Sequence, residues 1–201
     1  MPLLVLEGVD GCGKSTQATL LEARLRAEGR DVRRLREPGG TRLGEAVRAI
    51  LLDPATEAGA EAELFGYLMA RAQLCREVIA PALARGTWLV LDRFWHSTLA
   101  YQAWGLGLDP QRVRAAIELA VGAVRPDRAL LLRVPGAEAA ARRAARGEAA
   151  DRIEARGAGY QARVAAGYEA LVASGDLQPV DAGGEPAAVA ERIWAMVGSA
   201  G

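Results

Sequence analysis

The segment Gly8–Ser15, which reads GVDGCGKS, constrains the fold more than any other part of the chain. It matches the spaced pattern Gly-x-x-x-x-Gly-Lys-Ser/Thr. A run of four apolar residues, Leu3–Leu6, precedes it, and a helical pattern from about Lys14 to Glu28 follows it. Because the pattern belongs between a buried strand and a helix, we expect a strand–loop–helix unit built on a parallel sheet.

The chemistry of this loop follows from its residue types. Glycines let successive backbone N–H groups face one concavity, and the helix that begins near Lys14 adds the positive end of its dipole, so nucleotide phosphates can bind there. Lys14 is the only lysine among 25 basic residues, and its compact ammonium occupies a space that the planar fork of arginine does not. A glycine-rich turn that only caps a helix is the alternative. The residues expected to contact the nucleotide are Gly8, Val9, Asp10, Gly11, Cys12, Gly13, Lys14, Ser15 and Thr16.

Short apolar runs alternate with longer helical patterns along the rest of the chain. Continuous apolar runs are typical of strands that are buried on both faces. The expected strands are 3–6, 32–35, 88–91, 129–134 and 177–180, and the expected helices are 14–28, 42–52, 61–83 with an interruption at Pro81, 97–104, 110–121, an Ala- and Arg-rich helix, 160–173 and 186–197. This order predicts an α/β fold of the P-loop NTPase type, a three-layer sandwich with helices on both faces of a five-stranded parallel sheet, in one domain over residues 1–201.

The composition argues against several classes of protein. The 25 acidic and 25 basic residues cancel, so there is no general basic field of the kind that drives non-specific nucleic-acid binding. There is no run of about 18 apolar residues, and the start MPLLVLEG lacks the basic flank of a signal peptide. Two distant cysteines, Cys12 and Cys75, suit a reducing compartment. We therefore expect a cytoplasmic protein without a membrane or nucleic-acid partner.

The absence of asparagine narrows the choice of nucleotide. Guanine-specific switch proteins read their base with an Asn-Lys-x-Asp element, and this chain has no Asn and no lysine besides Lys14. We therefore expect ATP rather than GTP. Three classes of protein stay open at this point: motor or partition ATPases, kinases of small molecules, and noncatalytic ATP-binding regulators.

The segment that follows the expected strand 88–91 favours a kinase. Asp92 lies where a carboxylate that positions magnesium belongs in this fold, and the Ser15 hydroxyl can bind the same ion. Arg93, Ser97 and Tyr101 follow at steps of four, so they would share one face of a helix, and Arg93 can bridge two phosphates. A salt-bridged helix start is the alternative.

A second pair, Tyr67 and Arg71, lies four residues apart on the expected helix 61–83. An aromatic ring can stack on a nucleobase, and a guanidinium can bind its carbonyl group. The pair alone is weak evidence, because an aromatic side chain on a long helix more often belongs to the core.

Together these motifs resemble the thymidylate kinase family. The resemblance covers nearly the whole chain and rests on six segments in order: EGVDGCGKSTQ at 7–17, REPGGT at 36–41, MARAQ at 69–73, DRFWHSTLAYQ at 92–102, RPD at 125–127 and DRIE at 151–154. It implies transfer of the γ-phosphoryl group of ATP to dTMP, giving dTDP and ADP for dTTP biosynthesis, with Mg²⁺ as cofactor and a homodimer as the assembly. A kinase of another nucleotide or of a deoxynucleoside, and a noncatalytic ATP-binding regulator, stay open as alternatives.

The resemblance also implies roles around the acceptor. At the base, Tyr67 would stack on thymine, Arg71 and Gln102 would bind its polar edge, and Ser97 would lie nearby. At the sugar, Asp10 would lie near the 3′-hydroxyl and Tyr101 against the 2′ position. Arg48 and Arg93 would hold the phosphate of dTMP, and Glu37 would lie near magnesium or its waters. Glu154 would lie near magnesium as well, beside Ser15 and Asp92. An aromatic wall at the 2′ position favours deoxyribose, because it excludes a hydroxyl group and leaves it unpaired.

Gly11 places the chain in one subgroup of that family. Some members carry a basic residue at this position of the phosphate loop, whereas the others resemble this sequence and supply the charge from a lid. Here the lid would be the segment of about 142–157, which contains Arg142, Arg143, Arg146 and Arg152 around Gly147. Arg146 and Arg152, beside the glycine, are the first choices to join Lys14 and Arg93 as catalytic residues.

Overall fold

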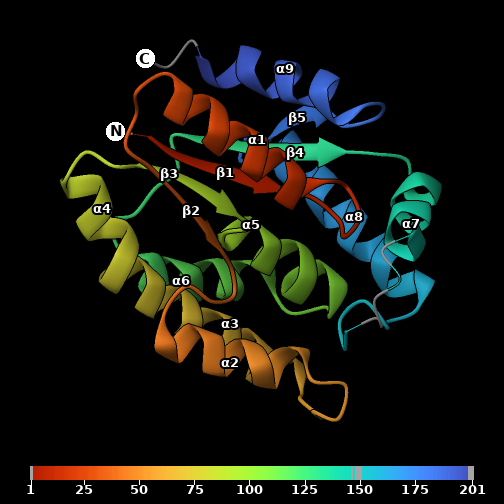
Figure 1. Cartoon of the computed structure of the whole chain (residues 1–201). Coiled ribbons are helices and arrows are strands. Elements are labelled where there is room, and N and C mark those ends of the chain that lie inside the picture. The colour runs from red at the N-terminus through yellow and green to blue at the C-terminus, as the bar shows by residue number, and fades with distance from the viewer. Residues whose placement is uncertain (1, 146, 148–150, 199–201) are drawn as a thin grey trace.

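Five parallel strands form the central sheet of the computed structural model (Figure 1). The strands are β1 (Leu3–Glu7), β2 (Val32–Arg36), β3 (Trp88–Asp92), β4 (Arg128–Arg133) and β5 (Gln178–Asp181). Their order across the sheet is β2-β3-β1-β4-β5, and every neighbouring pair runs parallel. The predicted α/β fold with a five-stranded parallel sheet is confirmed. The structure describes residues 2–145, 147 and 151–198.

Helices connect the strands and cover both faces of the sheet (Figure 1). They are α1 (Lys14–Ala27), α2 (Arg42–Leu52), α3 (Ala60–Leu74), the π-helical turn η1 (Cys75–Ile79), α4 (Ala80–Ala84), α5 (Trp95–Thr98), the π-helical segment η2 (Leu99–Gly105), α6 (Pro110–Val121), α7 (Gly136–Ala145), α8 (Ala158–Ala173) and α9 (Pro186–Val197). Within the described part of the chain, no helix has the length and apolar character needed to cross a membrane.

The side chains of β1 divide the core into two layers. Leu3 and Val5 point to one face of the sheet, Leu4 and Leu6 point to the other, and all four are buried. The first face packs against α3, α6 and α8, and the second packs against α1 and α9 (Figure 1). Because helices cover both faces, the strand appears in the sequence as a continuous apolar run rather than an alternating one.

The stretch predicted as helix 61–83 is divided earlier than expected. The π-helical turn η1 interrupts it, and the Ala80 N–H donates to Cys75 O, five residues back. Pro81 lies in the first turn of α4, so the interruption precedes the proline rather than occurring at it. Proline has no N–H to donate to the carbonyl four residues earlier, and the preceding turn takes the wider spacing.

The carboxyl ends of β1, β2 and β3 meet at one edge of the sheet and carry the residues that the sequence singles out. β1 continues into loop 8–13, β2 into turn 37–41, and β3 ends at Asp92. The strand order also reverses around β1, which is where open α/β sheets bind their ligands. The fold therefore brings the phosphate loop, the turn and the segment after β3 into one region.

Candidate functional site

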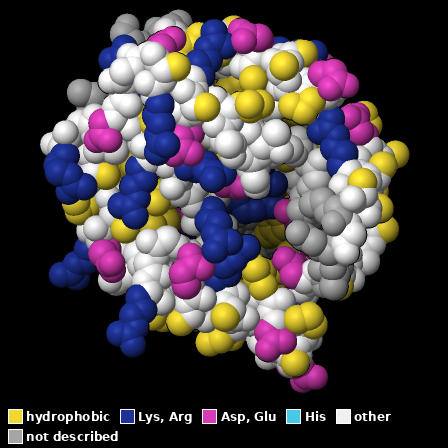
Figure 2. Space-filling view, viewed as in Figure 1, with side chains coloured by type: hydrophobic (Ala, Val, Ile, Leu, Met, Phe, Trp, Pro, Cys, Tyr) yellow, Lys and Arg dark blue, Asp and Glu magenta, His cyan; other side chains and the backbone are white. Residues whose placement is uncertain are grey.

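A cavity of about 670 Å³ opens at this edge of the sheet. Its size is typical of a small-molecule site, and Figure 2 shows a hollow bordered by basic side chains. Most of the predicted site residues line it: Asp10, Gly11, Cys12, Gly13, Lys14, Ser15, Thr16, Glu37, Arg48, Tyr67, Asp92, Arg93, Ser97, Tyr101, Gln102 and Glu154. Outside the lining are Gly8, Val9, Arg71 and Arg152. Arg146 lies outside the described residues.

The conformation of the phosphate loop depends on three glycines. Gly8, Gly11 and Gly13 have φ angles of 140°, 87° and 99°, which other residues rarely adopt. Lys14 is the first residue of α1, and its Nζ donates to the carbonyl oxygens of Gly8 and Val9 at 3.0 Å each. The first turn of α1, fully described, contains no acidic residue, so the positive end of this helix stays available to an anion.

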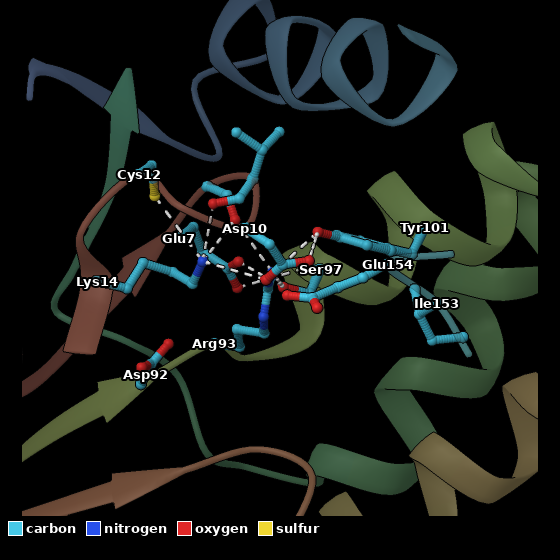
Figure 3. Close-up of polar contacts among 12 residues, drawn as sticks. Glu7, Asp10, Cys12, Lys14, Asp92, Arg93, Ser97, Tyr101, Ile153 and Glu154 are labelled. Carbon is cyan, nitrogen blue, oxygen red and sulfur yellow. Dashed lines mark hydrogen bonds and ion pairs between the residues drawn. The ribbon is translucent and has the colours of Figure 1, made fainter. Parts of the chain in front are cut away.

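Ser15 and Asp92 connect the loop to the end of β3. The Ser15 hydroxyl donates to Asp92 Oδ2 at 2.7 Å. A hydroxyl and a carboxylate are hard oxygen donors of the kind that Mg²⁺ takes, together with waters and substrate phosphates. The pair therefore fits the predicted ion, although the described residues contain no group of three or more His, Cys, Asp or Glu arranged for a metal. Glu154, the third predicted ligand, lines the same cavity (Figure 3).

Arg93 lies at the centre of the polar contacts in the site (Figure 3). Its φ angle of 70° is unusual for a residue other than glycine. Burial alone would lower the pKa of Arg93, but the nearby Asp10 carboxylate raises it well above its ordinary value, so the guanidinium is permanently charged. The groups that accept from it are Gly8 O, Ser97 Oγ and Tyr168 Oη through Nη1, and Asp10 Oδ1 and Tyr101 Oη through Nη2.

The prediction that Arg93, Ser97 and Tyr101 share one face of a helix is wrong. α5 begins at Trp95, so Arg93 precedes the helix, and Tyr101 lies in the π-helical segment η2. The three side chains nevertheless meet, because the left-handed backbone of Arg93 allows its side chain to lie across Ser97 and Tyr101.

Glu7 lies beneath this cluster and is fully buried. It accepts from Phe94 N at 2.7 Å, from Ser97 Oγ at 2.5 Å and from Tyr168 Oη at 2.9 Å. Because Ser97 and Tyr168 in turn accept from Arg93, the buried carboxylate fixes the hydroxyl groups that hold the guanidinium in place.

The predicted base-binding residues divide into two groups. Tyr67 and Gln102 line the cavity. Arg71 is buried behind the wall, where its Nε donates to Glu37 Oε2 at 2.7 Å and its Nη1 donates to Thr98 Oγ1 at 2.6 Å. Burial raises the pKa of Glu37 more than the Arg71 charge lowers it. The structure therefore pairs Arg71 with Glu37. Only those N–H groups of Arg71 that do not already donate to protein acceptors remain for a ligand.

Arg48 and the arginines of α7 contact different parts of the cavity wall. Arg48 lines the cavity, and its Nη1 donates to Pro38 O at 3.0 Å. On the loop side, the α7 residues Arg142 and Arg143 donate to the carbonyl oxygens of Cys12 and Asp10 at 3.5 Å and 2.5 Å.

Gly11 marks the place where α7 meets the phosphate loop. A Cβ atom built on Gly11 would overlap Ala139 O in the α7 backbone and would crowd the Arg143 side chain. The α7 backbone therefore occupies the space that any side chain at position 11 would need. Arg152, one of the predicted catalytic residues, instead donates through Nη2 to the buried carboxylate of Glu63 at 2.7 Å.

Three residues that organise this site, Glu7, Glu63 and Tyr168, are not among those predicted from the sequence. Glu7 could have been noticed, because it is a charged residue at the end of an apolar run directly before Gly8. Glu63 and Tyr168 carry no comparable signal, because their partners lie in segments far away in the sequence.

Basic side chains line the cavity at two places, Lys14 at the loop and Arg48 with Arg93 farther along. A P-loop with further cationic side chains in the same cavity is typical of enzymes that transfer a phosphoryl group. Comparisons with known proteins identify the branch of that class. The family model described as thymidylate kinase matches residues 6–193.

Individual relatives agree with the family match. The chain is 47% identical to a thymidylate kinase from Solidesulfovibrio magneticus, over 97% of this chain and 98% of the relative. It is 45% identical to a thymidylate kinase from Desulforudis audaxviator, over 96% and 89%. The crystal structure of thymidylate kinase from Ehrlichia chaffeensis superposes with a TM-score of 0.79 at 26% identity, over 96% of this chain and 97% of that chain. The chain belongs to the thymidylate kinase family.

Proposed function

We infer that this chain transfers the γ-phosphoryl group of ATP to dTMP, giving dTDP and ADP, as a step toward dTTP. As a member of its family, it is an ATP-dependent phosphotransferase that acts on dTMP. The observation that carries this inference is the family match over residues 6–193, on a chain whose phosphate loop and Tyr67 line one continuous cavity.

We propose that Lys14 and Arg93 act on the transferring phosphoryl group. The acceptor is already a phosphate, whose oxygens are mostly ionised at neutral pH, so no general base is needed. The protein must instead reduce the repulsion between two anions and align them in line. Lys14 at the loop and the charged Arg93 beside it supply positive charge from both sides. His96, the only histidine, is fully buried and has no part in this step.

Arginines of the lid, about 142–157, would complete the positive charge around the phosphates. Arg142 lines the cavity and contacts the loop, which supports a role at ATP. Arg152 and Arg146 stay the predicted catalytic residues of this segment. In the structure Arg152 is paired with Glu63, so its role at the phosphoryl group would require it to exchange that partner.

The proposed cofactor is Mg²⁺. Ser15 and Asp92 would hold it, with Glu154 near its waters, and their oxygen chemistry supports this assignment. When bound, the ion would neutralise charge on the β- and γ-phosphates of ATP.

We assign the sugar and the base of dTMP to the far end of the cavity. Tyr67 would stack on thymine, with Gln102 and Arg71 at its polar edge and Ser97 nearby, while Arg48 would join Arg93 at the acceptor phosphate. Tyr101 is mostly buried, and its hydroxyl donates to Asp10 Oδ2 at 3.3 Å. This pair supports a rigid wall at the 2′ position, with the Asp10 carboxylate near the 3′-hydroxyl.

ADP release with a panel of nucleotide acceptors tests the proposed function. The purified chain with ATP and Mg²⁺ should release ADP fastest with dTMP. Preference for dCMP, dGMP or thymidine would indicate another kinase, and binding of ATP without product from any acceptor would indicate a noncatalytic regulator.

We also propose a homodimer in the cytoplasm. Large apolar side chains are exposed on the adjacent helices α2 and α3: Ile50 is 61% exposed, Phe65 63% and Met69 48%. Phe65 and Met69 lie four residues apart on one face of α3, and such a patch suits contact with a second copy. The expected result of Phe65→Glu is a monomer in size-exclusion chromatography with light scattering. A monomeric unmodified chain would contradict the assembly. Cys12, a free thiol within the phosphate loop, suits the reducing cytoplasm.

A further inference from the structure

Glu63 is a fully buried carboxylate that none of the roles above explains. It lies in the first turn of α3 and is 0% exposed. Three side chains donate to it: Gln102 Nε2 to Oε1 at 3.0 Å, Arg152 Nη2 to Oε2 at 2.7 Å, and Arg156 Nη1 and Nη2 to Oε1 and Oε2 at 3.1 and 2.6 Å. Burying a carboxylate costs free energy unless hydrogen-bond donors and positive charges of this kind satisfy it. The three donors around Glu63 meet this requirement.

The cluster keeps Glu63 ionised. Burial alone would raise the pKa of Glu63, but hydrogen bonds from Arg156 and Gln102, together with the charges of Arg156 and Arg152, hold it below its ordinary value. An ionised carboxylate has no hydrogen to donate and only accepts hydrogen bonds. Gln102 must therefore turn its NH₂ group, and not its carbonyl oxygen, toward Glu63.

This constraint decides what Gln102 presents to the cavity. Gln102 lines the cavity wall. With Nε2 bonded to Glu63, the free end of its amide is Oε1, and none of the described residues donates to that oxygen. Arg71, which lies behind the wall and donates to Thr98 of the wall, offers only donors. The base pocket thus combines one fixed acceptor with donors close by.

We propose that Glu63 is a specificity-determining residue, which fixes the amide of Gln102 so that the pocket selects a pyrimidine with an N–H at ring position 3. This inference rests on the proposed function. Thymine and uracil present that N–H beside a carbonyl oxygen at position 4, whereas cytosine presents a lone pair beside an amino group. Cytosine would therefore set its lone pair against Gln102 Oε1 and its amino group against the donors of Arg71. In a buried site, polar groups left without a hydrogen-bond partner cost enough free energy to discriminate strongly against the wrong base.

A purely structural role for Glu63 makes a different prediction. Arg152 and Arg156 belong to the lid segment, and Arg152 Nε also donates to Leu51 O at 2.8 Å. If Glu63 only tied this segment to α3, its loss would weaken turnover of every acceptor equally. Discrimination between two bases that differ only at positions 3 and 4 separates the two roles.

The test compares dUMP with dCMP, since both lack the methyl group of thymine. Inhibition constants of the two against dTMP phosphorylation give a discrimination ratio for each variant. The unmodified protein should bind dUMP more tightly than dCMP. In Glu63→Gln the neutral partner permits either orientation of the Gln102 amide, so the ratio should fall by roughly 10- to 100-fold, the range for a hydrogen bond to a charged group.

Two further variants serve as controls. Arg156→Gln disturbs the lid contacts but leaves the hydrogen bond between Glu63 and Gln102, so its ratio should stay within about twofold of the unmodified protein. Glu63, Arg152 and Arg156 together carry a charge of +1, and the double variant Glu63→Gln with Arg156→Gln keeps that charge. If Glu63→Gln does not fold, the double variant should show the same fall in ratio.

The outcomes distinguish this inference from the proposed function. Equal inhibition by dUMP and dCMP in the unmodified protein overturns the inference, and so does an unchanged ratio in the folded Glu63 variants. An equal fall in Arg156→Gln overturns it as well, because the effect would then come from the lid. Absence of dTMP phosphorylation by the unmodified protein would instead refute the proposed function.

Discussion

Replacing Glu7 with glutamine should reduce the stability of the protein, and the loss should depend on pH. Glu7 is fully buried and accepts from Phe94 N, Ser97 Oγ and Tyr168 Oη at 2.7, 2.5 and 2.9 Å. Glu7→Gln preserves the volume of the side chain but removes its charge, and it turns one accepting oxygen into an NH₂ group that faces the two hydroxyls. The network must rearrange, and its charge-assisted bonds are lost.

The magnitude follows from the pKa of Glu7, which lies at about 2 instead of its ordinary 4.5. Burial alone would raise this pKa, but the His96 ring at 3.6 Å, the charge of Arg93 and the hydrogen bond from Ser97 more than reverse that effect. A shift of this size is worth roughly 3 kcal/mol. Because the folded pKa is depressed, the stabilisation is complete above the unfolded pKa of 4.5 and is lost as the pH falls toward 2. At pH 3.5, roughly 1 kcal/mol of this stabilisation has already been lost.

Urea unfolding of both proteins, followed by circular dichroism, measures this effect. At pH 7 the variant should be less stable by roughly 3 kcal/mol, and at pH 3.5 the gap should narrow to roughly 2 kcal/mol. The matched control is Glu169→Gln, which removes an exposed carboxylate paired with Arg133 and should change stability by less than about 0.5 kcal/mol. A gap that is below 1 kcal/mol or does not change with pH would refute the reasoning.

Three further variants test the active centre in steady-state kinetics. Lys14→Arg should lower kcat roughly 100-fold, because the guanidinium does not fit where a compact ammonium contacts the loop; retention of a tenth of the rate would contradict this. Gly11→Ala should lower kcat roughly tenfold and leave KM for dTMP nearly unchanged, because the new Cβ displaces α7 at Ala139. An unaltered kcat would show that α7 adapts to the added methyl group. Asp92→Asn should raise the Mg²⁺ concentration needed for half-maximal rate roughly tenfold, because it weakens the ligand pair with Ser15; an unchanged Mg²⁺ dependence would exclude Asp92 as a ligand.

Local patterns explain which parts of the site could be predicted from the sequence. The phosphate loop is one continuous segment whose strand, glycines and lysine follow each other directly, so its geometry is determined within about ten residues. Asp92 was equally accessible, because an apolar run ends at it and parallel strands place their carboxyl ends together. In both cases the spacing in the sequence determines the spacing in the structure.

Contacts between distant segments explain what could not be predicted. Glu63 and Gln102 are 39 residues apart, and no periodicity relates the start of α3 to η2. Arg71 shows a second limit, because the spacing from Tyr67 predicts a shared helix face but not whether that face meets the cavity or the core. Arg71 ended in the core against Glu37, since a buried carboxylate required its charge.

The contact between Gly11 and α7 constrains how a chain of this family could change during evolution. A basic side chain at position 11 would occupy the space of the α7 backbone at Ala139. A basic residue at position 11 and the present position of α7 therefore exclude each other. Loss of the arginine side chains of α7 would not make room for an arginine at position 11, because the overlap is with the α7 backbone. The α7 helix must move before or together with a substitution at position 11, so the two changes are coupled rather than independent.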